Sequence, residues 1–434
     1  MFGYFATTLQ RGEIFMFEVE LKRIIKMKST WILTLIGVLV CAIFALSTIL
    51  QVVKYIDLGN SQTAIVRGVS VYNENKTRYE PIEGEVTPEL ISSAIQIHQT
   101  LLEQYGSDGN IPAEIKDEVL GPYSPVYTWI FRTFSDKDLI HEDITPEQAM
   151  EFYPERLRML ENQLKIKYEQ TPQVVEFAMD NAIESQKNYH YSYGIGSTNA
   201  FVNLGTCAFL IAIIAVIIAA PIFSAGYSRG EDNILRSTKR GRSELAATRI
   251  SATLLVVFLV TVLCIGTFLI IMYAAFGFDD ITSADLLQID YNPLELDAIG
   301  IMWLIVLSSV LAAMVMGSFA LFISSRTSSP LLTLAICISV ALIPTIFSIF
   351  EAGGSFGHGF AAVEGNLFNW IRICLPSGGV SLTGSMLNEL ISLRFIWIGD
   401  FVAWTPPTML ISAAIQIPLW ITLTILSYNK HRVK

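Results

Sequence analysis

The chain has 434 residues, of which 52% are hydrophobic and only 16% are charged, and its net charge at pH 7 is −10. This composition excludes an ordinary soluble domain, in which about 25% of the residues are charged. A helix needs about 20 apolar residues to cross the hydrocarbon core of a bilayer. The sequence therefore predicts an all-α integral membrane protein with six transmembrane helices, at residues 30–53, 200–223, 250–276, 299–323, 331–350 and 407–428.

The first predicted element is an amphipathic helix within a cytoplasmic N-terminus, residues 1–29. Helical spacing gathers apolar residues on one face, with charged residues around it, which is typical of an interfacial elbow helix along the inner leaflet. A simple extension of the first span is the alternative. The elbow residues are Phe17, Leu21, Lys22, Arg23, Ile24 and Ile25. We expect no cleavable signal peptide, since the first apolar run is already of span length, and either Met1 or Met16 can be the start.

Residues 54–198, which follow the first span, carry 23 acidic and 12 basic residues. A segment of this length is large enough for its own small core. Three Thr-Pro pairs place a capping hydroxyl before a proline at the first helical position, which marks helix starts. The sequence predicts a mostly helical extracytoplasmic domain with helices at Pro88–Gln104, Pro146–Tyr153, Glu155–Gln170 and Pro172–Asn188, and an aromatic-rich element at Tyr123–Phe134. The following Tyr189, Tyr191 and Tyr193 favour an interfacial aromatic anchor over a ligand-binding role.

The rest of the chain, residues 199–434, holds five spans whose connections differ in charge. The connection at 225–249 is basic, as are both ends of the chain, whereas residues 279–297 contain six acids and no lysine or arginine. Basic residues near the ends of spans stay in the cytoplasm. We therefore predict a bacterial plasma-membrane protein with both termini cytoplasmic and residues 54–198 extracellular. The outer region at 351–405 is too polar to span, and short helices or a re-entrant hairpin are expected there.

No motif in the sequence indicates catalysis or metal binding. A phosphate-cradling Gly-x-x-x-x-Gly-Lys-Ser/Thr is absent, and neither the five histidines nor the five cysteines are spaced as metal ligands. Gly353-Gly354-Ser355-Phe356-Gly357 matches a serine-hydrolase elbow in letters, but that motif needs a preceding strand. The predicted spans contain no Asp, Glu, Lys or Arg, the usual marks of an ion route. We predict that the chain is no enzyme and that its energy arrives from a partner.

A dense polar stretch, Ser228–Arg242, lies between two long uncharged runs. It mixes acidic with basic residues, which exceeds what membrane orientation alone requires. A short charged helix at the inner surface offers partners of both signs for recognition. We infer a docking surface in this stretch. For Arg249, which follows it, a plain positive-inside anchor is the alternative.

This stretch and its surroundings resemble the permease subunits of type-2 ABC exporters of Gram-positive bacteria with a large extracytoplasmic domain. In that family the loop commonly has Ser-x-Gly-Thr-Asp, an apolar pair, and then Ser-x-Lys-x-Gly-Arg/Lys. Glu231 replaces the threonine, and Ala225–Tyr227 occupy positions where an acidic residue is often found. Leu375-Pro376-Ser377, before the last span, also matches. The loop residues that fit are Ser228, Gly230, Asp232, Ile234, Leu235, Ser237, Lys239, Gly241 and Arg242.

The resemblance implies a permease subunit that pairs with a second one, as homo- or heterodimer, in the lipid bilayer. It implies docking of a separate ABC ATPase subunit, which would bind ATP and Mg, so that no cofactor binds this chain directly and no nucleic acid is a partner. The docking surface would comprise the elbow helix, the coupling loop 225–249 and the loop Ser324–Ser329. The coupling residues are Gly230, Glu231, Asp232, Leu235, Arg236, Lys239, Arg240, Gly241, Arg242 and Arg326.

Three functions are compatible with these features. The leading hypothesis is ATP-driven export of an amphipathic peptide, drug or lipid-like compound, because uncharged spans favour such cargo. Cation (sodium) extrusion is an alternative, and the carboxylate-free spans count against it. A membrane sensor or immunity factor, whose outer domain binds an antimicrobial peptide without transporting it, is another. The sequence leaves the substrate-binding residues unknown.

Overall fold

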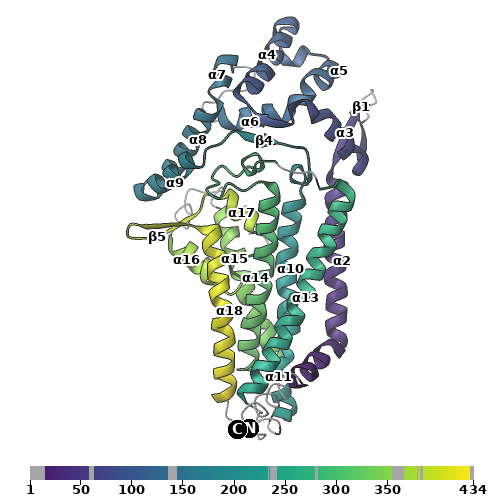
Figure 1. Ribbon diagram of the computed structural model, residues 1–434, viewed down its shortest axis with the longest axis vertical. Coiled ribbons are helices and arrows are strands. Elements are labelled where there is room, and N and C mark those ends of the chain that lie inside the picture. The colour runs from purple at the N-terminus through teal and green to yellow at the C-terminus, as the bar shows by residue number, and fades with distance from the viewer. Residues whose placement is uncertain are drawn as a thin grey trace, which may run out of the picture.

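The computed structural model (Figure 1) shows a long helical bundle with a smaller, mostly helical domain stacked on one end. The structure describes residues 15–57, 63–134, 144–232, 234, 242–278, 282–353, 366–378, 380–381 and 385–430. We call the end of the bundle beside the domain the domain end. The opposite end is the terminal end, because the first described helix lies there and the last one ends there.

The bundle is built from the long uncharged segments. Its central helices pack along each other, and four more long helices pack around them. Apolar side chains fill the interior and also cover much of the outside, as on Leu46 and Ile415. A helix that is apolar all round is typical of a membrane span. The helices are α2 (Lys28–Gln51), α10 (Ala200–Ala219), α11 (Pro221–Arg229), α13 (Ser243–Phe276), α14 (Ala298–Ser324), α15 (Pro330–Gly353) and α18 (Thr405–Lys430), with α10 and α14 at the centre.

Among the described residues, five helical segments are long and apolar enough to cross a membrane, namely α2, the α10–α11 unit, α13, α14 and α18. Each coincides with a predicted span, so a mostly helical membrane protein is confirmed. The remaining predicted span, 331–350, falls within α15, a helix of 24 residues. Its stretch Pro330–Ile346 is apolar but shorter than the others. A sixth crossing by α15 therefore stays a prediction.

Two helices extend past their predicted limits at the terminal end. Pro221 does not end its helix, because α11 continues from α10 with Ala220 in helical conformation. α13 begins at Ser243, ahead of the predicted Ile250, and runs unbroken for 34 residues. Glu244 in its first turn is favourable beside the positive end of the helix dipole. At 1.5 Å per residue α13 is about 50 Å long, so it joins the two ends of the bundle (Figure 1).

The N-terminal helix, residues 15–26, ends before Met27, where the backbone is extended. Thr30 Oγ1 donates to Ile24 O at 2.9 Å and Trp31 Nε1 to Ile25 O at 2.8 Å, which fixes the bend into α2. Of the predicted apolar face, Ile24 is fully buried, and Phe17 and Leu21 pack against the bundle. Ile25 is exposed instead. The bend separates this helix from the span, and its place at a membrane surface stays a prediction.

The domain begins with a hairpin and continues as short helices. The hairpin, β1 (Val53–Asp57) with β2 (Thr63–Arg67), and a second pair, β3 (Gly84–Val86) with β4 (Tyr189–Tyr191), were not predicted. The predicted helix starts at Pro88, Pro146 and Pro172 are confirmed. The helices are α3 (Val69–Tyr79), α4 (Pro88–Tyr105), α5 (Ala113–Ile115), α6 (Ser124–Phe134), α7 (Pro146–Met150), α8 (Phe152–Lys167) and α9 (Pro172–Glu184), with short turns at Glu80–Ile82, Asp108–Asn110, Lys116–Leu120, Gly121–Tyr123 and Ile195–Ser197.

The prediction that three tyrosines anchor the second span at the membrane surface is wrong. Tyr189, Tyr191 and Tyr193 are buried inside the domain. The Tyr191 ring makes an edge contact with Trp129 at 5.2 Å, and Tyr193 lies 5.1 Å from Tyr72. The tyrosines occupy every second position of the sequence. This alternation suits a strand with one buried face.

Two connections complete the domain end. Residues 282–297 form a short helical turn, Ala284–Leu287, and contact the domain where Arg132 pairs with Asp290 at 2.6 Å. The second connection contains α16 (Asn366–Cys374), α17 (Met386–Ile391) and the hairpin β5 (Phe395–Ile398) with β6 (Phe401–Trp404). The described part of the predicted outer region thus contains short helices, as expected, together with an unpredicted hairpin.

Candidate functional site

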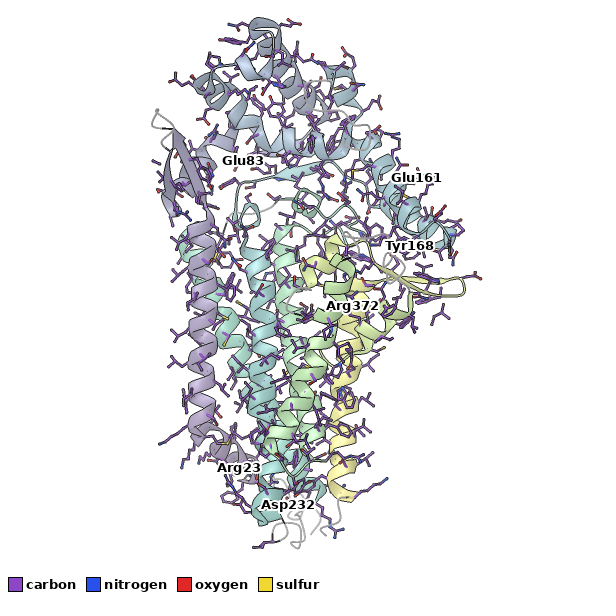
Figure 2. All side chains as sticks on the ribbon, turned by 180° about the vertical axis from the view of Figure 1, so that it is seen from behind. Arg23, Glu83, Glu161, Tyr168, Asp232 and Arg372 are labelled. Atoms are coloured by element: carbon purple, nitrogen blue, oxygen red, sulfur yellow. The ribbon has the colours of Figure 1, made fainter. Side chains whose placement is uncertain are left out.

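Segments far apart in the sequence meet at the terminal end of the bundle. They are the N-terminal helix, α11 with residues 230–232, the start of α13, the connection between α14 and α15, and the last turns of α18. Arg23 and Asp232 mark this region in Figure 2. The predicted docking surface therefore lies on several elements at once.

The start of α11 is held by Ser324, at the end of α14. Its Oγ accepts from Phe223 N at 3.1 Å and from Ser224 N at 3.0 Å, and it donates to Ala220 O at 2.6 Å. α11 starts anew at Pro221, so its first backbone N–H groups have no partner within the helix, and this side chain satisfies two of them. Further along α11, Tyr227 OH donates to Ser325 O at 3.3 Å. The loop after α14 is thus tied to α11 and residues 230–232, which we call the coupling segment after the predicted loop.

A buried charge network links the coupling segment to three other elements. Arg249, on α13, lies 3.3 Å from Glu20 of the N-terminal helix (Nε to Oε1) and 3.5 Å from Asp232 (Nη1 to Oδ1). Tyr428 OH, on α18, donates to Asp232 Oδ1 at 2.7 Å. Arg249 is 2% exposed and Asp232 1% exposed. We call these four residues, Glu20, Asp232, Arg249 and Tyr428, the terminal-end network.

Aromatic rings enclose this network on the bundle side. The Arg249 guanidinium lies 5.8 Å from the centre of the Phe223 ring, an attractive cation–π geometry. The Tyr428 ring lies 5.1 Å from Phe223 and stacks on Tyr227 at 6.4 Å. Rings and charges together exclude water from the join between α11, α13 and α18, which strengthens each electrostatic contact there.

The predicted coupling residues fall into three groups. Gly230, Glu231, Arg242 and Arg326 are exposed, with Glu231 3.8 Å from Arg229. Asp232 is buried and acts within the network rather than on the surface. The remaining predicted residues lie outside the described part of the chain: Leu235, Arg236, Lys239, Arg240 and Gly241.

The charged elbow residues lie beside this surface. Lys22 pairs with Glu18, one turn away, and its side chain is well exposed. Arg23 Nη2 lies 2.9 Å from Glu20 Oε2, so Arg23 continues the terminal-end network toward solvent. Exposed charges on the N-terminal helix and on the coupling segment are therefore supported by one buried set of ion pairs.

Sequence reasoning missed two members of the network. In the sequence Glu20 is one charge among several on an amphipathic helix, and Tyr428 is the end of a span. Arg249, for which a membrane anchor is the alternative to a place in the docking loop, lies buried between two carboxylates. An arginine directly before the long uncharged part of α13 was the available signal, because a buried cation needs a partner.

The chain as a whole, with these elements in this order, can be compared with known protein families. The model of the ABC-2 family transporter proteins matches residues 14–422, from the N-terminal helix into α18. The chain belongs to the ABC-2 transporter family. It is thus a transport protein of the membrane, and the resemblance to ABC permeases is confirmed. No curated protein matches the chain.

In this ABC-2 permease, the described residues include no group of three or more His, Cys, Asp or Glu side chains that could hold a metal ion. The terminal-end network has two ion pairs that, with the Tyr428 hydrogen bond, join four elements, so the segment that carries Asp232 is tied to α13, to α18 and to the N-terminal helix.

Proposed function

We propose that this ABC-2 permease is the membrane subunit of an ATP-driven exporter for an amphipathic peptide, drug or lipid-like compound. A separate ATPase subunit, holding ATP and Mg, docks at the terminal end. The terminal end then faces the cytoplasm, and residues 54–198 lie outside the cell. The dense basic sequence around residues 225–249 and the acidic domain support this orientation.

The observation that carries the proposal is the buried terminal-end network beneath exposed charges. Exposed residues such as Glu231 and Arg326 offer recognition sites of both signs. Directly below them, Asp232 and Arg249 tie that surface to the long helix α13. Force applied by a docked subunit therefore has a packed, charge-linked route into the bundle.

α13 carries that route to the domain. Its last residue, Phe276, is buried and lies 4.3 Å from the Tyr72 ring of α3. An unbroken helix transmits displacement along its axis better than a loop does. ATP-driven closure at the terminal end can in this way alter the join between bundle and domain, as an alternating exporter requires.

A site-specific photo-crosslinking experiment in native membranes tests the docking assignment. A photoreactive amino acid at Glu231 should crosslink to a polypeptide that carries a phosphate-binding ATPase motif, identified by mass spectrometry. The same probe at Ile398, which is exposed on the β5–β6 hairpin at the domain end, is the matched control and should not. Crosslinking of the ATPase from Ile398 alone would overturn both docking site and orientation.

Charge reversal then tests whether the contact conveys energy. Changing Lys239, Arg240 and Arg242 to Glu should weaken co-purification of the ATPase about tenfold, through lost electrostatic complementarity. Unchanged co-purification and unchanged ATPase stimulation would show that the surface lies elsewhere. Vesicle uptake assays separate the alternatives: sodium accumulation would favour cation extrusion, and cargo-dependent ATPase activity without accumulation would favour a sensor or immunity factor.

A further inference from the structure

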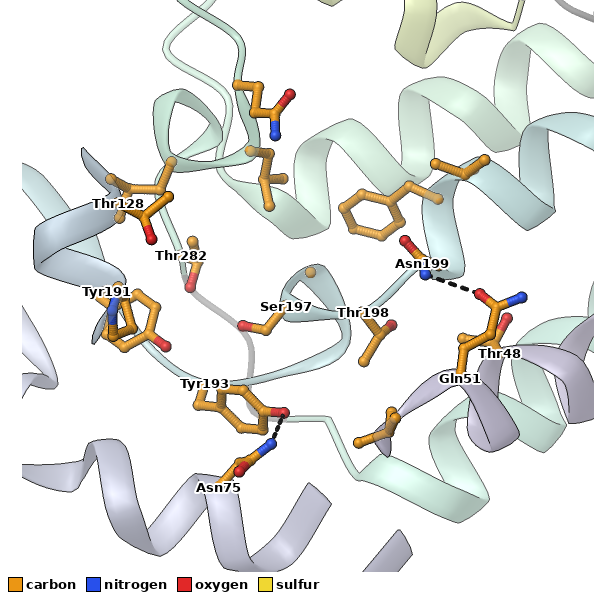
Figure 3. Close-up of a pocket in the computed structure, with 18 of the residues that line it drawn as sticks. Thr48, Gln51, Asn75, Thr128, Tyr191, Tyr193, Ser197, Thr198, Asn199 and Thr282 are labelled. Atoms are coloured by element: carbon orange, nitrogen blue, oxygen red, sulfur yellow. Dashed lines mark hydrogen bonds between the residues drawn. The ribbon is translucent and has the colours of Figure 1, made fainter. Parts of the chain in front are cut away.

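A cavity of about 560 Å³ lies where the domain meets the domain ends of α2 and α10 (Figure 3). Its walls come from α6, the end of α2, residues 282–288 and residues 191–199, which lead from β4 into α10. Sites for small molecules commonly enclose roughly 300–1,000 Å³. The cavity is therefore large enough for a ligand, and the docking proposal does not use it.

The described side chains that line this cavity include none that is charged. The surrounding sequence is strongly acidic, both in residues 54–198 and in residues 279–297. A charged ligand would leave water for a site that offers no opposite charge, which costs free energy. The lining thus selects for a neutral ligand.

The polar part of the lining consists of amides and hydroxyls. Asn199 Nδ2 donates to Gln51 Oε1 at 2.8 Å, and Asn75 Nδ2 donates to Tyr193 OH at 3.0 Å, so each side of the cavity is braced (Figure 3). Amides and hydroxyls both donate and accept hydrogen bonds, as the hydroxyls of a sugar do. Further groups of this kind come from Thr128, Ser197, Thr198 and Gln288.

Aromatic rings stand beside these polar groups. Half-buried Trp129 and buried Tyr191 meet edge to face at 5.2 Å in the wall of the cavity. Such rings combine a broad apolar face with a polar edge, which suits a sugar ring with its C–H face and its hydroxyl rim. We propose that the cavity binds an uncharged glycosyl group.

The bundle side of the cavity favours a glycosyl group that is carried on a lipid. Val52, Phe201 and Leu387 form an apolar floor there. Val202, also in the lining, is 53% exposed, and Leu50 on α2 is 55% exposed. These side chains continue the apolar outer surface of the bundle, so acyl chains can lie against it while the headgroup enters the cavity.

The cavity also adjoins the far end of α13. Tyr193 lies 5.1 Å from Tyr72, which contacts Phe276. Movement of α13 would therefore reshape one wall of the site. This last step rests on the function proposed above, whereas binding itself does not, because it requires neither ATP nor an ATPase subunit.

Binding can be measured on the full chain, purified alone in a detergent without a sugar headgroup. The probes are diglucosyl diacylglycerol, phosphatidylglycerol with the same acyl chains, and free maltose, each followed by native mass spectrometry and thermal shift. We expect the glycolipid to bind at least about tenfold more tightly than the anionic lipid, a difference of about 1.4 kcal/mol. Maltose that competes for the site would show that the sugar suffices, and maltose that does not would assign the site to a lipid-borne sugar.

Two threonines provide a matched pair of variants. Thr128 on α6 and Thr100 on α4 are both exposed, and each donates Oγ1 to the carbonyl one turn earlier. Only Thr128 lines the cavity. Thr128→Glu should weaken glycolipid binding at least about tenfold, whereas Thr100→Glu should leave it within about twofold.

Asn199→Leu, in a second part of the wall, should weaken binding as well, which guards against a folding defect of one variant. Equal affinity for the glycolipid and phosphatidylglycerol, or equal effects of the two threonine variants, would overturn the proposal. Because no ATPase is present, such a failure would leave the docking proposal untouched. A failed ATPase crosslink would equally leave the binding result intact.

Discussion

Each end of the bundle contains a buried ion cluster, and the two are built differently. At the domain end, Glu389 is held by Arg372 through both carboxylate oxygens, by Arg394 at 2.8 Å and by Thr405 at 3.1 Å. Arg372 marks this cluster in Figure 2. At the terminal end, Arg249 faces Glu20 and Asp232 at 3.3 and 3.5 Å. The domain-end cluster has short contacts and a bidentate pair, whereas the two ion pairs of the terminal-end network are longer and share Arg249.

This difference indicates different roles. Bidentate pairs between arginine and carboxylate fix geometry as well as charge, and the Glu389 cluster lies within one connection between α15 and α18. The terminal-end network joins residues separated by 229 and 196 positions in sequence. Contacts near the limit of hydrogen-bonding distance exchange with small movements. We infer that the domain-end cluster holds its connection rigid while the terminal-end network can rearrange.

The largest effect should come from Glu389→Ala. It leaves Arg372 and Arg394 buried or half-buried without their carboxylate, and breaking a buried pair in this way costs about 3–5 kcal/mol. Chemical unfolding of the purified permease should register this loss. Glu231→Ala, at an exposed glutamate, is the control and should leave stability unchanged. Equal stability of the two variants would contradict the role assigned to Glu389.

Acid titration tests the same cluster without a mutation. Burial alone would raise the pKa of Glu389, but Arg372 and Arg394 outweigh it and lower the pKa to about 2 from an ordinary value of 4.5. The unfolded chain therefore binds this proton first as pH falls. The stabilisation, about 3 kcal/mol at 1.36 kcal/mol per unit, is complete above about pH 4.5 and is lost toward about pH 2. The difference in unfolding free energy between wild type and Glu389→Gln should shrink over that window.

The sequence predicts this fold where a single segment decides its own structure. Uncharged runs of about 20 residues must be helical in lipid, and the Thr-Pro pairs at Thr87 and Thr145 act as caps, each hydroxyl accepting a backbone N–H. Five spans and the main helices of the domain follow from such local rules. The hairpin and the second strand pair of the domain were missed because their strands have only three to five residues.

The candidate site could be predicted only in outline. The charged stretch after the second span identified the region, but the partners that bury Asp232 come from α13 and α18. Charge alone does not distinguish a surface residue from a buried one when a residue that covers it, here Tyr428, lies 196 positions away in the sequence. The prediction of a membrane anchor at the tyrosines before α10 was wrong for the same reason, because only the folded domain brings Trp129 and Tyr72 against them.

Arg249→Met should lower stability less than Glu389→Ala does, and it should lower the stimulation of the ATPase more. It removes the cation shared by Glu20 and Asp232, and we expect a loss of about 2–3 kcal/mol, at or below the range for a close buried pair. ATPase stimulation by the reconstituted complex should fall about tenfold while the ATPase still co-purifies. A double-mutant cycle with Glu20→Gln should return a coupling energy above about 0.5 kcal/mol. Additive effects would show that Glu20 and Arg249 act independently.

The smallest effect is expected from Tyr428→Phe. This change removes one hydroxyl that donates to Asp232 at 2.7 Å and leaves the ring stacked on Tyr227. A hydrogen bond to a charged group contributes about 1.5–3 kcal/mol, and the remaining contact of Asp232 with Arg249 should keep the loss near the lower value. Tyr105→Phe, at the last residue of α4, is the control for the loss of a tyrosine hydroxyl outside the network. If Tyr428→Phe lowers ATPase stimulation more than it lowers stability, α18 is part of the rearranging network; if stability alone changes, α18 only supports it.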